Sequence, residues 1–382
     1  MIFVSGPRQV GKTTLFTQLS KSLPGSIYNW DRLPDRRRIT AEPDSLFEGD
    51  SVYFDEIHKF PRWKNFLKGG FDAHGDHCKI HVTGSARLDV YRRGGDSLLG
   101  RYIKYTMHPF TAGEILGVNR KPLEPLELDA VLREAKPGSS ELIETWKLLE
   151  RFGGFPEPFT KANDRHYNQW LQNRHERLVR EDIRDMTRIR ELSLFESMVA
   201  LLPSKIGSPL SLNSLKEDLS VSHDSIRLWL SLLEEFYYLF GLPCHSEKVA
   251  RSLKKERKIY LWDWSEIDDP AIRFENMVAC HLNKFVDYMT DSGLAKCSLR
   301  YFRDKERNEV DFIVLKNRNP WFMVEAKLND RSIQKALLSG SKKHGSPPCI
   351  QLVNDFGTSS HRKIDGMDYY VMPAAIFFRE LI

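Results

Sequence analysis

The sequence predicts an α/β protein in which a parallel-sheet domain comes first, a helical region follows, and a second α/β domain ends the chain. Three observations carry this prediction. A glycine-rich loop at residues 6–14 joins a short apolar strand to a helix, a later apolar strand ends in two acids at 55–56, and strands within 309–327 carry spaced acidic and basic side chains. Strands that alternate with helices are typical of parallel sheets.

Composition indicates an ordinary globular protein of two or three domains. The chain has 382 residues, of which 41% are hydrophobic and 29% charged, and its net charge is +5 at pH 7. No apolar run approaches the roughly 18–20 residues of a membrane-spanning helix, and no leader opens the chain, so we expect a cytoplasmic protein without a membrane partner. The five cysteines are scattered and lack C-x-x-C spacing, which argues against a zinc site or a disulfide frame.

The loop that opens the chain has the spacing G-x-x-x-x-G-K-T of a phosphate-binding loop. Gly6 and Gly11 let successive backbone N–H groups turn onto phosphates. Lys12 is expected to reach the β- and γ-phosphates, the Thr13 hydroxyl to bind Mg²⁺, and Thr14 to lie in the first turn of a helix whose positive end faces the anion. A glycine-containing surface turn is the alternative, but it rarely brings both a strand and a helix.

The first strand begins directly at Met1. Either the fold tolerates a first strand of three or four residues, or the native reading frame starts upstream.

The apolar strand 51–54 ends in Asp55 and Glu56. Some forty residues after a phosphate-binding loop, this pattern predicts that Asp55 holds Mg²⁺ through its water shell and that Glu56 polarises the attacking water. The next apolar strand ends in Thr83 and Ser85. We expect one of these hydroxyls, Ser85 in the first instance, to sense the γ-phosphate; a plain strand-end turn is the alternative.

Arg101 follows a leucine-rich segment and has two interpretations. It is either an arginine finger for this or a neighbouring subunit, which would require a homo-oligomer, or a structural arginine.

The segments GPRQVGKTT, VYFDEIHK, HVTGSARL, LLGRY and HPFTAGEI resemble bacterial and archaeal AAA-type ATPases with a helical and winged-helix middle and a C-terminal nuclease-like domain. The resemblance extends over essentially the whole chain. It implies ATPase activity, ATP as ligand, and an ATP site that includes Gly6, Gly11, Lys12, Thr13, Asp55 and Glu56. The expected domains are an AAA-like ATPase domain at 1–118, a helical connector at 119–205, a winged-helix-like domain at 206–247 and a nuclease-like domain at 248–382.

Residues 211–219 and 222–230 have helix-turn-helix form, with Ser222 capping the second helix and 237–240 starting a wing. The outward side chains of the second helix are not richly basic, so protein contact or domain spacing explains the pattern at least as well as sequence-specific DNA reading. The basic run 251–258 is either a non-specific phosphate patch or a solvated linker.

The last domain carries four side chains in a recognisable order. Glu275 lies on an expected helix, Asp311 on a strand, and Glu325 and Lys327 on one face of the next strand. This order resembles the PD-(D/E)XK nuclease fold, also called restriction-endonuclease-like. The resemblance implies that Glu275, Asp311 and Glu325 bind Mg²⁺ or Mn²⁺ and that Lys327 orients or deprotonates the attacking water. The alternative is a binding module that has lost cleavage.

These patterns lead to one hypothesis with two alternatives. The chain is expected to bind and hydrolyse ATP, and its nucleotide state to control a metal-dependent deoxyribonuclease acting on DNA. The first alternative is a nucleotide switch whose last domain binds nucleic acid or a protein without cleaving. The second is a toxin–antitoxin or defence regulator in which the winged helix binds DNA or a partner.

Overall fold

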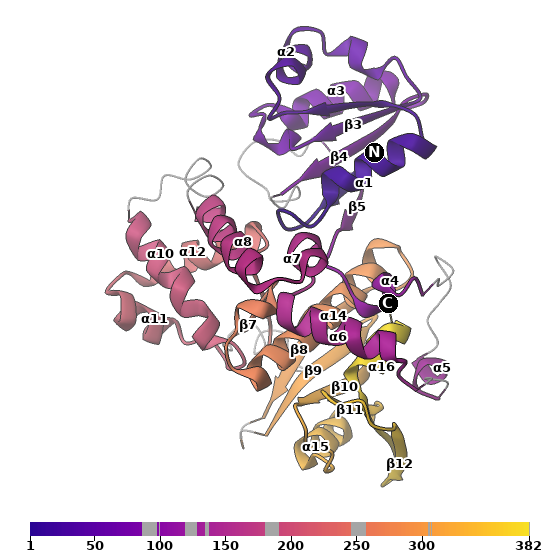
Figure 1. The fold of residues 1–382 in the computed structure, drawn as a ribbon, viewed down its shortest axis with the longest axis vertical. Coiled ribbons are helices and arrows are strands. Elements are labelled where there is room, and N and C mark those ends of the chain that lie inside the picture. The colour runs from indigo at the N-terminus through magenta and orange to yellow at the C-terminus, as the bar shows by residue number, and fades with distance from the viewer. Residues whose placement is uncertain are drawn as a thin grey trace. The chain divides into compact units, whose positions relative to one another are not determined.

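The structure of the protein is a computed structural model. The structure describes residues 1–85, 98, 100–118, 128–133, 137–179, 191–245, 257–304, 306 and 308–381. The chain divides into two compact units, and each is treated by itself (Figure 1). Unit 1 comprises Met1–His108 with Glu235–Tyr237, and unit 2 comprises Pro109–Glu234 with Tyr238–Ile382. Among the described residues, no helix is both long and apolar enough to cross a bilayer.

Unit 1 is built on a parallel sheet, as the sequence predicts. Its strands lie in the order β2-β3-β4-β1-β5, and every neighbouring pair is parallel. The carboxyl ends of all its strands therefore meet at one edge, where ligands of open α/β sheets bind. The strand bounds are β1 (Ile2–Ser5), β2 (Ser26–Asn29), β3 (Ser51–Asp55), β4 (Lys79–Gly84) and β5 (Ile103–Thr106).

Helices cover both faces of this sheet (Figure 1). Alternate residues of a strand point to opposite faces. Accordingly, Tyr53 packs with Phe16 of α1, whereas its neighbour Phe54 belongs to the larger core cluster that contains Leu67 of α3. The bounds of these elements are α1 (Lys12–Ser22), α2 (Leu33–Ala41), α3 (Trp63–His74), and the short 3₁₀ segments η1 (Asp44–Phe47) and η2 (Ile57–Lys59).

Unit 2 begins with the expected helical region. Ser139 caps α6 by accepting a hydrogen bond from the Leu142 N–H at 3.1 Å, as serine does at many helix starts. Trp146 and Leu149 of α6 are buried at helical spacing. The helices are α4 (Ala112–Ile115), α5 (Leu128–Arg133), α6 (Ser140–Phe152), α7 (Pro156–Lys161), α8 (Asp164–Glu176) and α10 (Leu192–Leu201), followed by the 3₁₀ segment η4 (Leu202–Lys205).

Two helices and a two-stranded antiparallel ribbon follow, at the positions where the sequence predicts a helix-turn-helix and the start of a wing. They are α11 (Leu212–Leu219), α12 (His223–Glu235), β6 (Leu239–Leu242) and β7 (Lys258–Leu261). Strand β7 pairs antiparallel with β6, so the expected boundary at residue 247 separates two strands that the structure joins. Most of the basic run 251–258 lies outside the described residues; its last member, Lys258, is fully buried and is neither a solvated linker residue nor part of an exposed phosphate patch.

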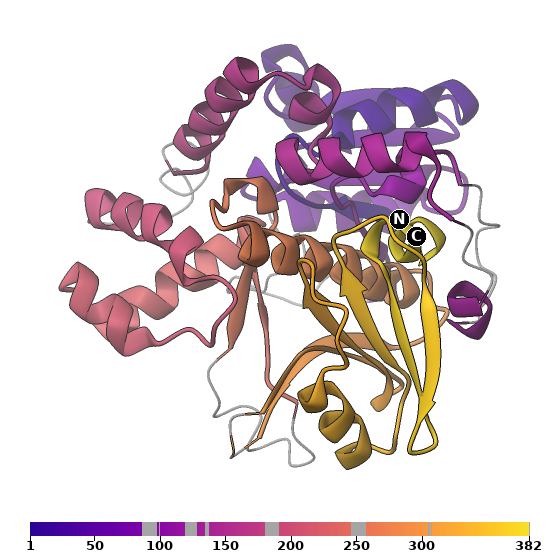
Figure 2. The same ribbon diagram turned by 60° about the horizontal axis from the view of Figure 1, so that its bottom comes forward.

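A mixed sheet forms the rest of unit 2, in the order β12-β13-β11-β10-β9-β8 (Figure 2). Strands β8, β9 and β10 are antiparallel neighbours, and β11 then runs parallel to β10. The elements are η5 (Trp264–Glu266), α14 (Pro270–Asp291), β8 (Cys297–Arg303), β9 (Glu309–Lys316), β10 (Asn319–Lys327), α15 (Lys335–Lys343), β11 (Cys349–Val353), β12 (Ser360–Ile364), β13 (Met367–Pro373) and α16 (Ala374–Leu381).

Alternation along β10 shows which helices cover which face of this sheet. Phe322 meets Phe285 of α14 and Phe377 of α16, with ring centroids 6.3 and 6.4 Å apart. The next residue, Met323, joins the cluster that contains Leu337 of α15. Because successive side chains of a strand point to opposite faces, α14 and α16 cover one face and α15 covers the other.

Candidate functional site

The phosphate-binding loop lies at the carboxyl edge of the unit 1 sheet, between β1 and α1. Gly6 has no room for a side chain, since a Cβ there would lie 2.3 Å from the Met107 carbonyl oxygen. Gly11 has φ 106°, in the left-handed region that glycine adopts without strain. The Lys12 ammonium donates to the carbonyl oxygens of Gly6 and Pro7 at 2.9 and 2.7 Å, so it lies against the loop that would surround the phosphates.

The expected Mg²⁺ residues are in direct contact. The Thr13 hydroxyl donates to Asp55 Oδ2 at 2.8 Å, and Asn29 Nδ2 donates to the same oxygen at 2.8 Å. Thr83 donates a short hydrogen bond to Asp55 Oδ1. A hydroxyl and a carboxylate brought together at the start of α1 fit Mg²⁺, which prefers hard oxygen ligands. Asn29 was not predicted from the sequence, although a polar residue at the end of a strand next to the Asp55 strand is a usable signal.

Glu56 lies beside this pair in a left-handed conformation, with φ 54°. Ser85 donates to its carboxylate at 3.1 Å, and His58 Nε2 and Lys59 Nζ each lie 3.7 Å from Glu56 Oε2. Burial tends to raise the pKa of Glu56, but the charges of His58, Lys12 and Lys59 and the Ser85 hydrogen bond lower it below its ordinary value. The carboxylate is therefore ionised at neutral pH and able to accept a proton.

The two hydroxyls considered as γ-phosphate sensors each form a hydrogen bond with a different acid at the end of β3. Thr83 bonds Asp55, whereas Ser85 bonds Glu56. His58 and Lys59 were not selected from the sequence, although they follow Glu56 directly in η2.

Two further residues of unit 1 were predicted, Thr14 and Arg101. Thr14 is exposed in the first turn of α1. The Arg101 guanidinium pairs with Asp72 of α3 through Nε and Nη2, at 2.7 and 3.3 Å. An arginine finger must point at a nucleotide, so this role for Arg101 stays a prediction that requires the Asp72 pair to be released.

In unit 2, three of the four residues singled out from the last domain, Asp311, Glu325 and Lys327, lie in contact with one another. The Asp311 N–H donates to Glu325 Oε2 at 3.4 Å, and the Ala326 N–H donates to Asp311 Oδ2 at 3.0 Å. Lys327 Nζ lies 2.8 Å from Glu325 Oε1. Burial and the nearby Asp311 charge raise the pKa of Glu275 to about 7 and that of Glu325 to about 8, because Lys258 and Lys327 compensate for only part of the effect.

A residue that the sequence analysis did not assign to this cluster lies within it. The Lys258 ammonium is 2.6 Å from Glu309 Oε1, 3.2 Å from Glu275 Oε1 and 3.5 Å from Asp311 Oδ1. Burial lowers the pKa of Lys258, but the three carboxylates raise it more strongly, and the net shift is upward. The group therefore carries a full positive charge among the expected metal ligands.

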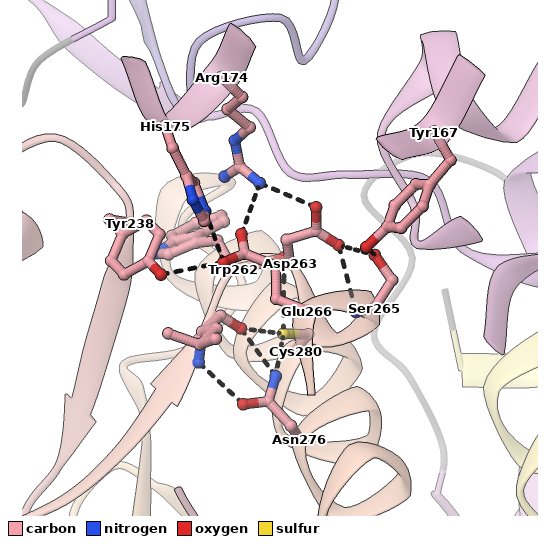
Figure 3. Close-up of polar contacts among 11 residues, drawn as sticks. Tyr167, Arg174, His175, Tyr238, Trp262, Asp263, Ser265, Glu266, Asn276 and Cys280 are labelled. Atoms are coloured by element: carbon pink, nitrogen blue, oxygen red, sulfur yellow. Dashed lines mark hydrogen bonds and ion pairs between the residues drawn. The ribbon is translucent and has the colours of Figure 1, made fainter. Parts of the chain in front are cut away.

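A second buried polar network fixes the connector helix α8 to η5, both within unit 2 (Figure 3). Arg174 Nη1 lies 2.9 Å from Asp263 Oδ2 and 3.3 Å from Glu266 Oε1. His175 Nε2 and the Tyr238 hydroxyl approach Glu266 Oε2 at 2.8 and 2.9 Å. Arg174 and His175 of α8 and the Tyr238 hydroxyl thus each contact an acid in or next to η5, which is typical of a structural clamp.

The pKa shifts in this network follow from burial and pairing. Burial raises the pKa of Asp263 to about 6, although Arg174 opposes the shift. Burial also tends to raise the pKa of Glu266, but His175 and Arg174 lower it by more than burial raises it. The net shift is downward, so Glu266 stays ionised. The clamp thus holds a buried cation against two buried acids.

Replacing Arg174 by Met is expected to lower the free energy of unfolding by about 3 kcal/mol, because it leaves buried acids without their cation. Urea denaturation followed by circular dichroism measures this loss. Arg151→Met is the matched control: Arg151 pairs with Asp164, and both side chains are more than half exposed, so the cost should stay below about 1 kcal/mol. Equal effects in the two variants would contradict a clamp role for Arg174.

Comparison with known proteins assigns the first domain and leaves the others without a function. A family model described as "AAA domain" matches residues 1–116. Residues 143–265 match "Domain of unknown function (DUF8612)", and residues 272–365 match "Domain of unknown function (DUF4143)". Uncharacterized proteins of Mycobacterium bovis and Mycobacterium tuberculosis are each 22% identical over 348 residues, which cover 89% of this chain and 73% of the relative.

Two solved structures show weak overall similarity. The Aeropyrum pernix ORC1 protein in complex with DNA is 14% identical, with a TM-score of 0.31 over 69% of this chain and 83% of that one. PCH-2 of C. elegans is 12% identical, with a TM-score of 0.24 over 61% of this chain and 60% of that one.

The loop G-x-x-x-x-G-K-T, the contact between Thr13 and Asp55, the sheet order and the family match all point to one assignment. Residues 1–116 form an AAA-type P-loop ATPase domain, a class of domain that binds and hydrolyses ATP with Mg²⁺.

Proposed function

We propose that this chain is a Mg²⁺-dependent ATPase whose nucleotide state controls the C-terminal part of unit 2. One observation carries the ATPase proposal: Thr13, Asp55 and Glu56 meet at the carboxyl edge of the sheet beside the glycine-rich loop. Lys12 would exchange its bonds to loop carbonyls for phosphate oxygens, and Thr13 and Asp55 would hold Mg²⁺, which neutralises charge on the β- and γ-phosphates.

Glu56 is the residue that we assign to the attacking water. Its carboxylate is ionised, and Ser85 and His58 limit its orientation from two sides. A base held in this way can accept a hydrogen bond from water and align it with the γ-phosphate. Thr83 keeps Asp55 and the Glu56 backbone together, since its hydroxyl bonds Asp55 and accepts from the Glu56 N–H at 3.4 Å.

For the C-terminal part we propose a PD-(D/E)XK-like core that acts on DNA. The support is the element order α14-β8-β9-β10-α15-β11, in which three antiparallel strands precede a helix and a parallel strand, together with the convergence of Asp311, Glu325 and Lys327. The carboxylates offer hard oxygen ligands for Mg²⁺ or Mn²⁺. Lys258 stands among the same carboxylates, so we assign no cleavage step to a metal here.

The first test is cleavage of supercoiled and linear DNA by the purified full chain. The reactions contain Mg²⁺ or Mn²⁺, with and without ATP, and include the Lys12→Ala and Lys327→Ala variants. Cleavage that disappears in Lys327→Ala and responds to ATP would support an ATP-controlled nuclease. ATP turnover without cleavage under any metal would favour the second candidate, a nucleotide switch whose C-terminal part binds nucleic acid or a protein. The buried Lys258 is the observation in favour of that candidate.

A further inference from the structure

Strand β7 presents two polar side chains to α14. Lys258 and Tyr260 are two residues apart on the strand and therefore share one face. Both reach the same acceptor: the Lys258 ammonium lies 3.2 Å and the Tyr260 hydroxyl 2.7 Å from Glu275 Oε1. Strand β6 follows α12 in the chain, and β7 pairs with it. These contacts therefore join the β6–β7 ribbon to the carboxylate cluster within unit 2.

The ammonium of Lys258 has the geometry of a bound cation. It has three N–H donors, and three carboxylates lie within 3.5 Å of it: those of Glu309, Glu275 and Asp311. The side chain is 1% exposed, so water compensates for little of this charge. An ammonium that satisfies three acids in a buried space competes directly with any other cation for the same oxygens.

A divalent ion would need some of these oxygens for itself. Mg²⁺ requires oxygen ligands at about 2.0–2.1 Å in a nearly octahedral arrangement. Glu275 Oε1 and Asp311 Oδ1 face the Lys258 ammonium. Within the described part of the chain, no group of three or more His, Cys, Asp or Glu side chains is arranged to hold a metal ion. The cluster as it stands does not fit a divalent cation.

We propose that Lys258 is a built-in cation that occupies the carboxylate cluster and excludes divalent metals from it, so that the cluster becomes a metal site only when this charge is removed or β7 withdraws. The inference rests on the cluster named in the proposed function, but it concerns metal binding rather than cleavage. Withdrawal of β7 would remove the ammonium and the Tyr260 hydroxyl from Glu275 together.

The experiment measures Mn²⁺ binding to the full chain without nucleotide, by electron paramagnetic resonance of free Mn²⁺. In the wild type we expect no Mn²⁺ binding that depends on Asp311. Lys258→Met should bind one Mn²⁺ at the cluster, with an affinity at least about tenfold above any Mn²⁺ binding by the wild type. The reason is that the carboxylates no longer face a fixed positive charge. The double variant Lys258→Met/Asp311→Asn should lose this binding, which assigns the ion to the cluster. Lys258→Arg keeps the charge and should resemble the wild type.

Removal of Lys258 can also destabilise the fold, since it leaves three acids unpaired. Lys258→Met/Glu309→Gln removes the charge together with its nearest acid and leaves Glu275, Asp311 and Glu325 in place; it too should bind Mn²⁺. Wild-type binding that equals that of the Met variants, or no binding in either Met variant, would overturn the proposal. Mn²⁺ binding by the Met variants without any DNA cleavage would support metal exclusion by Lys258 and contradict the proposed nuclease activity. DNA cleavage by the wild type that depends on a metal bound at Asp311 would support the nuclease activity and contradict metal exclusion.

Discussion

Lys12→Ala is expected to lower the rate of ATP hydrolysis by at least about a hundredfold and to leave the fold intact. Removing one group that stabilises developing charge commonly costs a factor of a hundred to a thousand in rate. Lys12 is nearly buried and is bonded to the loop carbonyls of Gly6 and Pro7. Its ammonium therefore lies against the loop that we propose to surround the phosphates. Phosphate release measures the rate, and circular dichroism checks the fold.

The matched control for this variant is Lys21→Ala. Lys21 lies in the last turn of the same helix, α1, and is exposed, so its loss should leave turnover within about twofold of the wild type. Wild-type hydrolysis in Lys12→Ala would refute the assignment of the phosphate-binding loop. A comparable loss in both variants would point to general damage to α1 rather than to a role for Lys12.

The first domain could be predicted in detail because its signals are local. Each candidate residue lies in a short motif that follows or ends a strand, and parallel strands bring their carboxyl ends to one edge. Thr13 and Asp55 therefore meet at 2.8 Å although 42 residues separate them. Asn29 was missed because a single asparagine at a strand end has no distinguishing spacing.

Contacts between side chains of unit 2 could be predicted from the sequence only where both residues lie on the same helix or strand. Glu325 and Lys327 share a face of β10, and period-two spacing reveals this directly. Arg174 and Asp263 are 89 residues apart, and no periodicity connects α8 with η5. Lys258 was hidden for another reason. It ends a charged run, and a basic residue there is usually solvated, but pairing of β7 with β6 directs its side chain inward.

The order of residues by which the last domain was predicted to resemble a nuclease does not determine whether its carboxylates bind a metal. The sequence predicted the elements that carry Glu275, Asp311 and Glu325, and the structure places all three in one region. Whether carboxylates bind a metal depends on what else faces them. A lysine from β7, a strand outside the predicted motif, changes the charge of the cluster, and no motif within the domain indicates its presence.

Glu56→Gln is expected to bind ATP and to hydrolyse it at least about a hundredfold more slowly, so that ATP accumulates on the protein. Loss of a positioned general base costs about a hundred- to ten-thousandfold in rate. The amide keeps the shape of the side chain and can still accept the Ser85 hydrogen bond, but it cannot take a proton. Rapid-quench assay of the nucleotide that stays bound after one turnover measures the effect.

Two comparisons make this result specific to Glu56. Glu48→Gln changes an exposed carboxylate in the same unit and should hydrolyse ATP as the wild type does. Ser85→Ala removes a hydrogen bond that orients Glu56 while leaving the base itself, so it should slow hydrolysis less than Glu56→Gln and leave ATP binding unchanged. Rapid release of ADP from Glu56→Gln would show that the base lies elsewhere. Loss of ATP binding would instead assign Glu56 a structural role, because its charge would then be needed to hold His58 and Lys59 beside the nucleotide.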